Sequence, residues 1–209
     1  MNVTIIPVGM LGTNCYLLAS RAGSCALIDP GAQPEKITDI LEEKEYTLRY
    51  ILLTHGHWDH LGAVKKLMEK FPGVPCYIGA EDKELLTDPE KSSRMARAQD
   101  WETLHIPDAK ELGDGDKLEL DELTLEVIET PGHSKGSVCY LCENIIFSGD
   151  TLFLENCGRC DLYGGDFGVM KKSLKRLAGL SGEYTVYPGH GEATSLSHER
   201  AHNPYINHA

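Results

Sequence analysis

The chain has 209 residues, the size of one sizeable domain or two small ones. A folded chain of this size buries roughly 70% of the surface that the unfolded chain exposes. Hydrophobic residues at 41% and charged residues at 25% exclude disordered, collagen-like and membrane-embedded proteins. Asp and Glu number 32 against 20 Lys and Arg, so the net charge of -12 repels phosphate backbones and argues against a nucleic acid partner.

The first half of the chain predicts strands separated by helices. Glycine-containing turns divide the first three strand-like runs, which is typical of consecutive antiparallel strands. Apolar residues at helical spacing predict a helix over residues 34–45 and a second helix that ends before Pro72. Residues 80–98 are charged and predict a mostly helical, solvated surface element. The strands expected in this half are residues 3–8, 14–19, 25–28, 50–53 and 74–78.

The second half repeats this plan. Strands are expected at residues 117–120, 123–129, 137–141, 145–148 and 184–187. A helix is predicted over residues 169–177, and a short helical tail near residues 195–202. Because the strands come in two batches with helices and no linker divides them, we expect one α/β domain over residues 1–209, a four-layer αββα sandwich of two mixed β-sheets with helices outside.

The cysteines raise the question of disulfides or a zinc ribbon. Seven is an odd number and several lie in strand-like runs, which argues against a disulfide framework. In a strand over residues 137–142, side chains three positions apart point to opposite faces, so Cys139 and Cys142 cannot share a metal ion. For Cys157 and Cys160, a regulatory disulfide and buried or idle thiols both stay open.

The sequence also predicts where the protein works. No apolar run approaches the ~20 residues of a membrane span. The first twenty residues lack the basic start of a signal peptide and are interrupted by Pro7, Gly9 and Gly12. We therefore expect a cytoplasmic protein without a membrane partner.

Metal-binding residue types follow four of the predicted strands, each next to a glycine. Glycine permits the close approaches needed where several loops converge, and loops at one edge of a sandwich can meet. Five imidazoles and two carboxylates are too many for one tetrahedral ion and suit two. The expected ligands are His55, His57, Asp59, His60, His133, Asp150 and His190.

These ligand types suit two divalent ions, zinc first, with iron or manganese as alternatives. A bridging carboxylate allows two cations to lie close together. Isolated histidines need no such role, and we interpret His105, His198, His202 and His208 as surface or packing residues.

The segment from His55 to His60 resembles the His-x-His-x-Asp-His signature of the metallo-β-lactamase superfamily, and the downstream ligand types match in order. The resemblance implies one ion held by His55, His57 and His133, and another held by Asp59, His60 and His190. It also implies that Asp150 bridges the two ions and that Asp59 and Asp150 are the catalytic carboxylates.

Within that superfamily, residues 148–153 with Cys157-Gly158-Arg159 are similar to glyoxalase II, which hydrolyses thioesters of glutathione. Glyoxalase II carries a helical carboxy-terminal domain, whereas 19 residues follow His190, so the short glyoxalase II-like hydrolases of bacteria are the better match. The resemblance implies a small-molecule thioester such as S-lactoylglutathione, attacked by a hydroxide that bridges the metal ions.

Two further residues are predicted to bind substrate. Arg159 matches a basic residue of glyoxalase II that contacts the thiol half of the substrate, with an ion pair to Asp161 as the alternative. Tyr163 either lines the pocket or packs on its loop. The oligomeric state stays open.

The alternative function is a sulfur dioxygenase. A related branch of the superfamily uses one iron held by residues that match His55, His133 and Asp150. A lactone hydrolase fits less well, because Phe153 lacks the hydroxyl of the tyrosine found in that branch.

Overall fold

Two mixed β-sheets form the centre of the computed structural model, which describes residues 1–92 and 104–207. The first sheet contains, in spatial order, β1 (Asn2–Val8), β2 (Thr13–Ala19), β3 (Ser24–Ile28), β4 (Thr47–Leu52), β5 (Cys76–Gly79) and β6 (Lys110–Leu112). The second contains β14 (Thr194–Ser195), β13 (Thr185–Pro188), β10 (Ile145–Gly149), β9 (Val138–Cys142), β8 (Leu123–Glu129) and β7 (Lys117–Leu120). A hairpin of β11 (Leu152–Phe153) and β12 (Asn156–Cys157) lies beside them.

Strand direction determines which loops share an edge. The strands β1, β2 and β3 pair antiparallel, as their turns predict, whereas β3, β4, β5 and β6 run parallel. In the second sheet β10 and β13 form a parallel pair. Parallel neighbours end at the same edge, so the loops after β3 and β4, and those after β10 and β13, emerge together.

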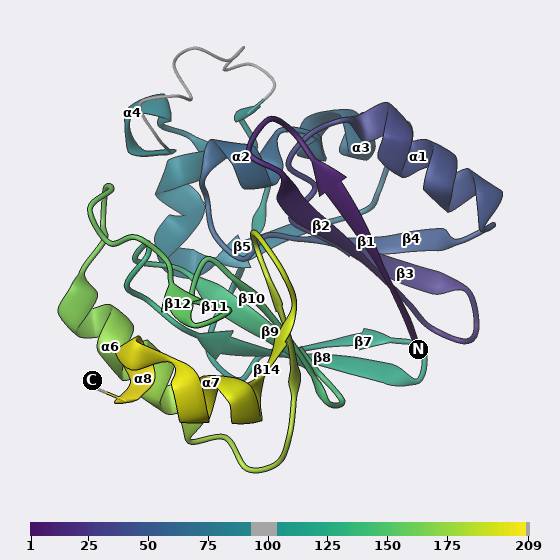
Figure 1. The fold of residues 1–209 in the computed structure, drawn as a ribbon. Coiled ribbons are helices and arrows are strands. Elements are labelled where there is room, and N and C mark those ends of the chain that lie inside the picture. The colour runs from purple at the N-terminus through teal and green to yellow at the C-terminus, as the bar shows by residue number, and fades with distance from the viewer. Residues whose placement is uncertain (93–103, 208–209) are drawn as a thin grey trace.

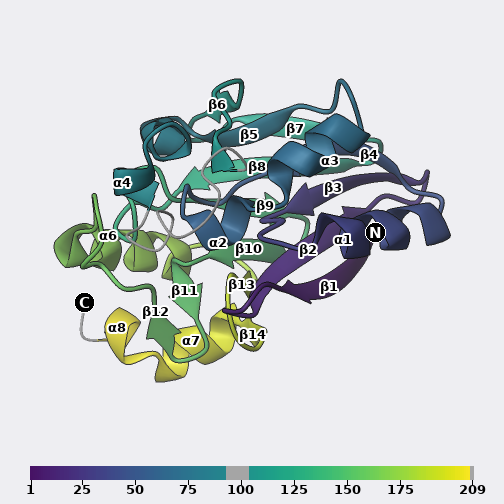
Figure 2. The ribbon, with the colours of Figure 1, turned by 90° about the horizontal axis from the view of Figure 1, so that it is seen from above.

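Helices cover the outer face of each sheet. Figure 1 shows α1 (Pro34–Glu43) and α3 (Val64–Lys70) on one side of the molecule and α6 (Phe167–Ala178) and α7 (Leu196–His202) on the other. Figure 2 gives the same elements from above, with α2 (Trp58–Leu61) above β10. The remaining short helices are η1 (Ala80–Leu86), α4 (Pro89–Ser92) and α8 (Pro204–Asn207). None of the described helices is long and apolar enough to cross a membrane.

Successive side chains along a strand point to opposite faces of its sheet and so pack into different layers of the sandwich. Along the fully buried β2, Leu17 packs under the helices of the first sheet, whereas Tyr16 points between the sheets, where it meets Phe147 with ring centroids 5.3 Å apart. Cys142 lies in this inter-sheet core and Cys139 lies under α6, on the opposite face of β9. The αββα sandwich is therefore confirmed, and the two cysteines do point to opposite faces.

Some element boundaries differ from the prediction. The helix expected over residues 169–177 begins earlier, at Phe167, because the Asp166 side chain caps it by accepting a hydrogen bond from Val169 N at 2.9 Å. The two- and three-residue strands β6, β11, β12 and β14 are too short to show a periodicity.

The expectation for residues 80–98 was wrong in part. Their first section is a 3₁₀ helix, η1, whose Asp82, Leu85 and Leu86 are buried, so it is not a solvated surface element. A short α4 follows, and residues 93–98 lie outside the described residues.

Candidate metal centre

All seven predicted ligand side chains come together at one edge of the sandwich. They lie on the loops that follow β4, β8, β10 and β13, and on the short helix α2 that continues the first of these loops. Five of them line a cavity of about 530 Å³, and the buried His55 and His60 contact these five. The five are His57, Asp59, His133, Asp150 and His190.

Three imidazoles form a first group. His57 Nδ1 lies 2.8 Å from His133 Nε2, which lies 3.2 Å from His55 Nε2. All three rings are buried, and one nitrogen from each lies within 4.8 Å of the others. Two nitrogen ligands of a tetrahedral zinc ion, each ~2.1 Å from the metal, stand about 3.4 Å apart, so this group has the spacing of a metal site.

A carboxylate and two imidazoles form a second group. His60 Nε2 lies 3.2 Å from His190 Nε2, and His190 Nε2 lies 3.3 Å from Asp59 Oδ2. The three ligand atoms also fall within 4.8 Å of one another.

Asp150 lies between the two groups. Its Oδ2 is 3.5 Å from His133 Nε2 in the first group, and its Oδ1 is 3.5 Å from His60 Nε2 in the second. A Cβ atom on Gly189 would lie 2.2 Å from Asp150 Oδ1, so only glycine leaves room for the carboxylate. This is the bridging position that the resemblance implies.

Hydrogen bonds at the outer side of four rings orient the imidazoles. His60 Nδ1 donates to Asp29 Oδ2 at 3.0 Å, and His133 Nδ1 donates to the Arg159 carbonyl at 2.7 Å. His55 Nδ1 faces Thr54 Oγ1, and His190 Nδ1 faces the Leu11 carbonyl, at 3.0 and 3.2 Å. With the proton on Nδ1, each ring turns the lone pair of Nε2 inward, as a metal ligand requires.

The unpaired atoms of the cluster test whether metal ions fit it. Among the described residues, the buried side-chain atoms without a hydrogen-bond partner are His57 Nε2 and Asp150 Oδ1. Inward-facing lone pairs of neighbouring rings cannot satisfy one another, and a buried carboxylate oxygen without a partner is costly. On the His57 ring it is Nδ1 that faces the group, so a divalent ion there would bind the inward-facing ring nitrogens and pair with Asp150 Oδ1. The residues therefore fit divalent ions.

Electrostatics differ between the groups. Burial and the neighbouring imidazoles lower the pKa of His57 to about 3, and they lower the pKa of His55 as well, so both rings are neutral near pH 7. Burial also opposes protonation of His60, but Asp59, Asp150 and Asp29 outweigh it and raise its pKa to about 10. The carboxylates around the second group therefore favour positive charge at His60, the place where a metal cation would lie.

Comparison with known proteins identifies the family. The model of the metallo-beta-lactamase superfamily matches residues 8–190, a span that includes every residue of the cluster. The chain belongs to the metallo-β-lactamase superfamily. Its two sheets with flanking helices are the fold of that superfamily.

Three similar proteins show the range within the superfamily. Hydroxyacylglutathione hydrolase GloC of Haemophilus influenzae is 32% identical, and the match covers 99% of each chain. The crystal structure of the BLEG-1 B3 metallo-beta-lactamase has a TM-score of 0.88 and 34% identity over 98% of this chain and 99% of that one. TTHA1623 in a di-iron-bound form has a TM-score of 0.83 and 38% identity over 97% and 100%.

Sequence reasoning missed two residues that support this superfamily site. Asp29 follows β3, and its two oxygens accept from Thr54 N at 2.8 Å and from Thr54 Oγ1 at 2.6 Å, besides facing His60. The sequence Asp29-Pro30-Gly31 after a strand repeats the pattern of the ligand loops and was a usable signal. Asn14 Nδ2 donates to the carbonyls of Pro188 and Gly191 and so holds the His190 loop; nothing in the sequence indicates this role.

The two predicted substrate residues lie in different surroundings. Arg159 lines the cavity, and its Nε and Nη2 donate to the Asp161 carboxylate at 2.6 and 2.7 Å. Tyr163 is not among the lining residues described, and its hydroxyl donates to Glu84 Oε1 at 3.0 Å. Substrate binding by Tyr163 stays a prediction, and the contact of its hydroxyl is with η1, which carries Glu84.

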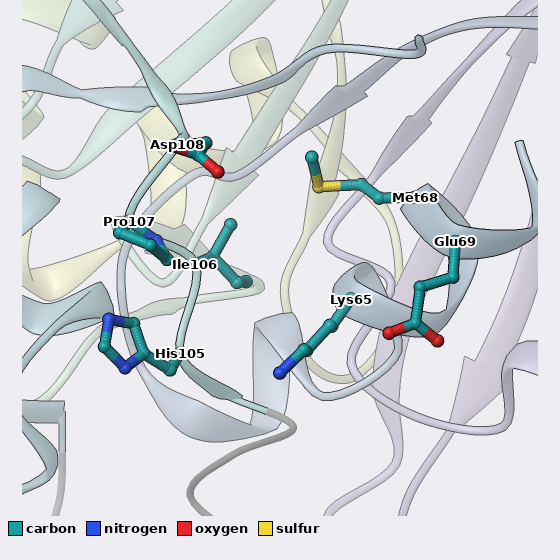
Figure 3. A pocket seen from close by; sticks show the side chains of 7 residues that line it. All are labelled: Lys65, Met68, Glu69, His105, Ile106, Pro107 and Asp108. Atoms are coloured by element: carbon teal, nitrogen blue, oxygen red, sulfur yellow. The ribbon is translucent and has the colours of Figure 1, made fainter. Parts of the chain in front are cut away.

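A second cavity, of about 430 Å³, shares no lining residue with the superfamily site. Figure 3 shows Lys65, Met68 and Glu69 of α3 facing the segment from His105 to Asp108 across it. It contains none of the predicted ligands, which gather at the first cavity.

Proposed function

We propose that this chain is a metal-dependent hydrolase that cleaves small-molecule thioesters with two divalent ions. The observation that carries the proposal is the pair of ligand groups, joined by Asp150, at the wall of an open cavity of about 530 Å³. His55, His57 and His133 would hold one ion, and Asp59, His60 and His190 the other. Zinc is the proposed metal, with iron and manganese as the alternatives that metal analysis distinguishes.

The side chains of the site have different roles. Divalent ions at the two groups would supply Lewis acidity, which lowers the pKa of water and polarises a carbonyl group. Asp59 and Asp150 supply negative charge that retains the cations, and the outer hydrogen bonds hold the imidazoles in one tautomer and orientation. Arg159 provides the positive charge at the cavity for a substrate carboxylate.

The remaining walls of the cavity favour a thioester over an amide. Among its described lining residues, those outside the proposed ligand set are Leu11, Trp58, Phe153, Arg159 and Leu162. None of these side chains gives up a proton near pH 7. A thiolate, whose conjugate thiol has a pKa near 8.5, leaves without a general acid, whereas an amine needs a proton. Hydroxyacylglutathione hydrolysis by the relative GloC supports the same choice.

The free thiols support a proposal for the compartment. All seven cysteines are unpaired, and burial raises the pKa of the Cys157 thiol to about 11, which disfavours the thiolate needed for disulfide formation. Free thiols support our proposal that the protein works in the reducing cytoplasm.

One set of assays tests the function. Purified protein is analysed for metals, and the same sample is assayed on S-lactoylglutathione, other thioesters and a β-lactam, with oxygen uptake on glutathione persulfide measured in parallel. We expect close to two ions per chain, thioester hydrolysis and slow amide cleavage, and Asp150→Ala should lower the occupancy of both ions. One iron with oxygen uptake and no hydrolysis would establish the dioxygenase instead, and at most one ion under metal-replete conditions would refute the dinuclear site.

A further inference from the structure

The buried carboxylate of Asp82 has no part in the chemistry described above. It lies on η1, is fully buried, and accepts three hydrogen bonds. Gly56 N donates to its Oδ2 at 2.9 Å, Ser134 Oγ donates to the same oxygen at 2.6 Å, and Gly136 N donates to its Oδ1 at 2.6 Å. All three donors belong to the loops of the metal centre.

Those donors lie directly beside the three-histidine group. Gly56 separates His55 from His57 on the loop after β4, and Ser134 follows His133 on the loop after β8. One carboxylate therefore joins the two segments that together supply this group. No other described side chain hydrogen-bonds to both loops.

Close packing leaves little freedom at this junction. A Cβ atom on Gly136 would lie 2.3 Å from Asp82 N, and one on Gly56 would lie 2.5 Å from Leu85 Cβ, so both loops press against η1. Ser134 Oγ is also 2.6 Å from Ser137 Oγ, and Ser92 Oγ donates to the Gly56 carbonyl at 2.8 Å. The loops cannot shift without breaking contacts to Asp82 or its neighbours.

We propose that Asp82 is a positioning residue that sets the spacing of the three-histidine group by holding the His55–His57 loop against the His133 loop. The inference rests on the metal part of the proposed function and is independent of the substrate. A carboxylate is required, because its two oxygens meet three donors. An asparagine at this position would turn an amide N–H₂ toward one of these donors and leave both groups unsatisfied.

The test compares Asp82→Asn with a matched control, Glu199→Gln. Glu199 is also fully buried and also accepts three hydrogen bonds, from Glu155 N, Thr194 Oγ1 and Asn203 Nδ2, but it joins helix α7 to segments that carry none of the predicted ligands. Metal-free proteins are titrated with Co²⁺ in the presence of a competing chelator, well below the melting temperature of each variant. The Co²⁺ absorption spectrum reports the coordination geometry.

We expect Asp82→Asn to lower Co²⁺ affinity by about 10- to 100-fold and to change the spectrum of the ion in the three-histidine group. The loss should persist when His190→Ala removes a ligand of the second group, which assigns it to the first. Glu199→Gln should lower the melting temperature without changing affinity or spectrum. Ser134→Ala removes one of the three hydrogen bonds and should give a smaller loss of Co²⁺ affinity. This variant tests the inference if Asp82→Asn does not fold.

Equal Co²⁺ affinity in the wild type and in Asp82→Asn or Ser134→Ala would overturn the inference, as would an equal loss in Glu199→Gln. Wild-type protein that binds no Co²⁺ would overturn both the inference and the proposed function. Wild-type protein that binds two ions but hydrolyses no thioester would overturn only the proposed function, because the affinity measurement uses no substrate.

Discussion

His133 Nδ1 donates a hydrogen bond to the backbone carbonyl of Arg159 at 2.7 Å, so the residue predicted to bind substrate also orients a predicted metal ligand. The two contacts use different atoms, because the carbonyl holds the imidazole whereas the guanidinium lies at the cavity and pairs with Asp161. Substitution of the side chain therefore separates substrate binding from metal binding.

Arg159→Ala should raise KM for thioesters that carry a carboxylate and leave the metal content unchanged. A charge-assisted contact is worth about 1.5 to 3 kcal/mol, which corresponds to a loss of roughly tenfold to a hundredfold in kcat/KM. The Arg159 and Asp161 side chains are 63% and 67% exposed, so losing the pair should barely change the melting temperature. Kinetics on one thioester with a carboxylate and one without, read beside a melting curve, measure both effects.

Asp161→Ala is the matched control. It frees the guanidinium while the Arg159 carbonyl still accepts from His133, so KM for the charged thioester should stay equal or fall. Equal losses on both thioesters in Arg159→Ala, with a lower melting temperature, would show that the side chain orders its loop and does not bind substrate.

Asp29→Asn should weaken the ion near His60. The carboxylate fixes the His60 tautomer and also accepts two hydrogen bonds from Thr54, so an amide at this position leaves one donor unsatisfied. Loss of such an outer contact lowers metal affinity by about 10- to 100-fold. Titration with metal in the presence of a competing chelator measures this affinity. Thr54→Val removes the hydroxyl that faces His55 and that also donates to Asp29 Oδ2, so it should weaken the ion of the three-histidine group as well as the ion near His60. Unchanged affinities in both variants would contradict the outer hydrogen-bond model.

The sequence predicts the candidate ligands, which the fold then brings together, because their signal is local. Strand ends, adjacent glycines and the spacing from His55 to His60 are readable without knowing which loops meet. Long runs such as β2 and β8 were predictable for a similar reason, since their apolar pattern extends over seven residues.

The supporting residues depend on contacts that the sequence does not show. Asp82 belongs to a charged segment, so its sequence predicts a solvated side chain. In the structure it is buried and accepts a hydrogen bond from Gly136, which lies 54 positions away. Asn14 reaches Gly191 across 177 positions. Only the fold pairs these groups, so burial of a charged residue can be recognised only once the tertiary structure is known.

Removal of the metal should destabilise the protein. Ligands that bind only the folded state add stability, about 2.7 kcal/mol at a free concentration of 100 times Kd. For a chain of this size each kcal/mol shifts the melting temperature by about 2–4 °C, so chelation should lower Tm by about 5–10 °C. Calorimetry before and after chelation, with restoration by added Zn²⁺, measures this. An unchanged Tm in a sample shown to be metal-free by elemental analysis would mean that the cluster does not bind ions tightly.

Phe153→Ala should reduce the preference for bulky apolar thioesters. Leu11, Trp58, Phe153 and Leu162 line the cavity, so apolar contact should dominate the binding of a thioester that carries no carboxylate. Losing about 50 Å² of apolar contact costs ~1.3 kcal/mol, or about tenfold in kcat/KM. We expect that loss on a benzoyl thioester and little change on an acetyl thioester of the same thiol. Leu154→Ala provides the control, because Leu154 is the next residue and is 40% exposed but is not among the lining residues described. An equal fall on both thioesters, or the same change in Leu154→Ala, would show that the substitution disturbs the hairpin of β11 and β12 and not a substrate contact.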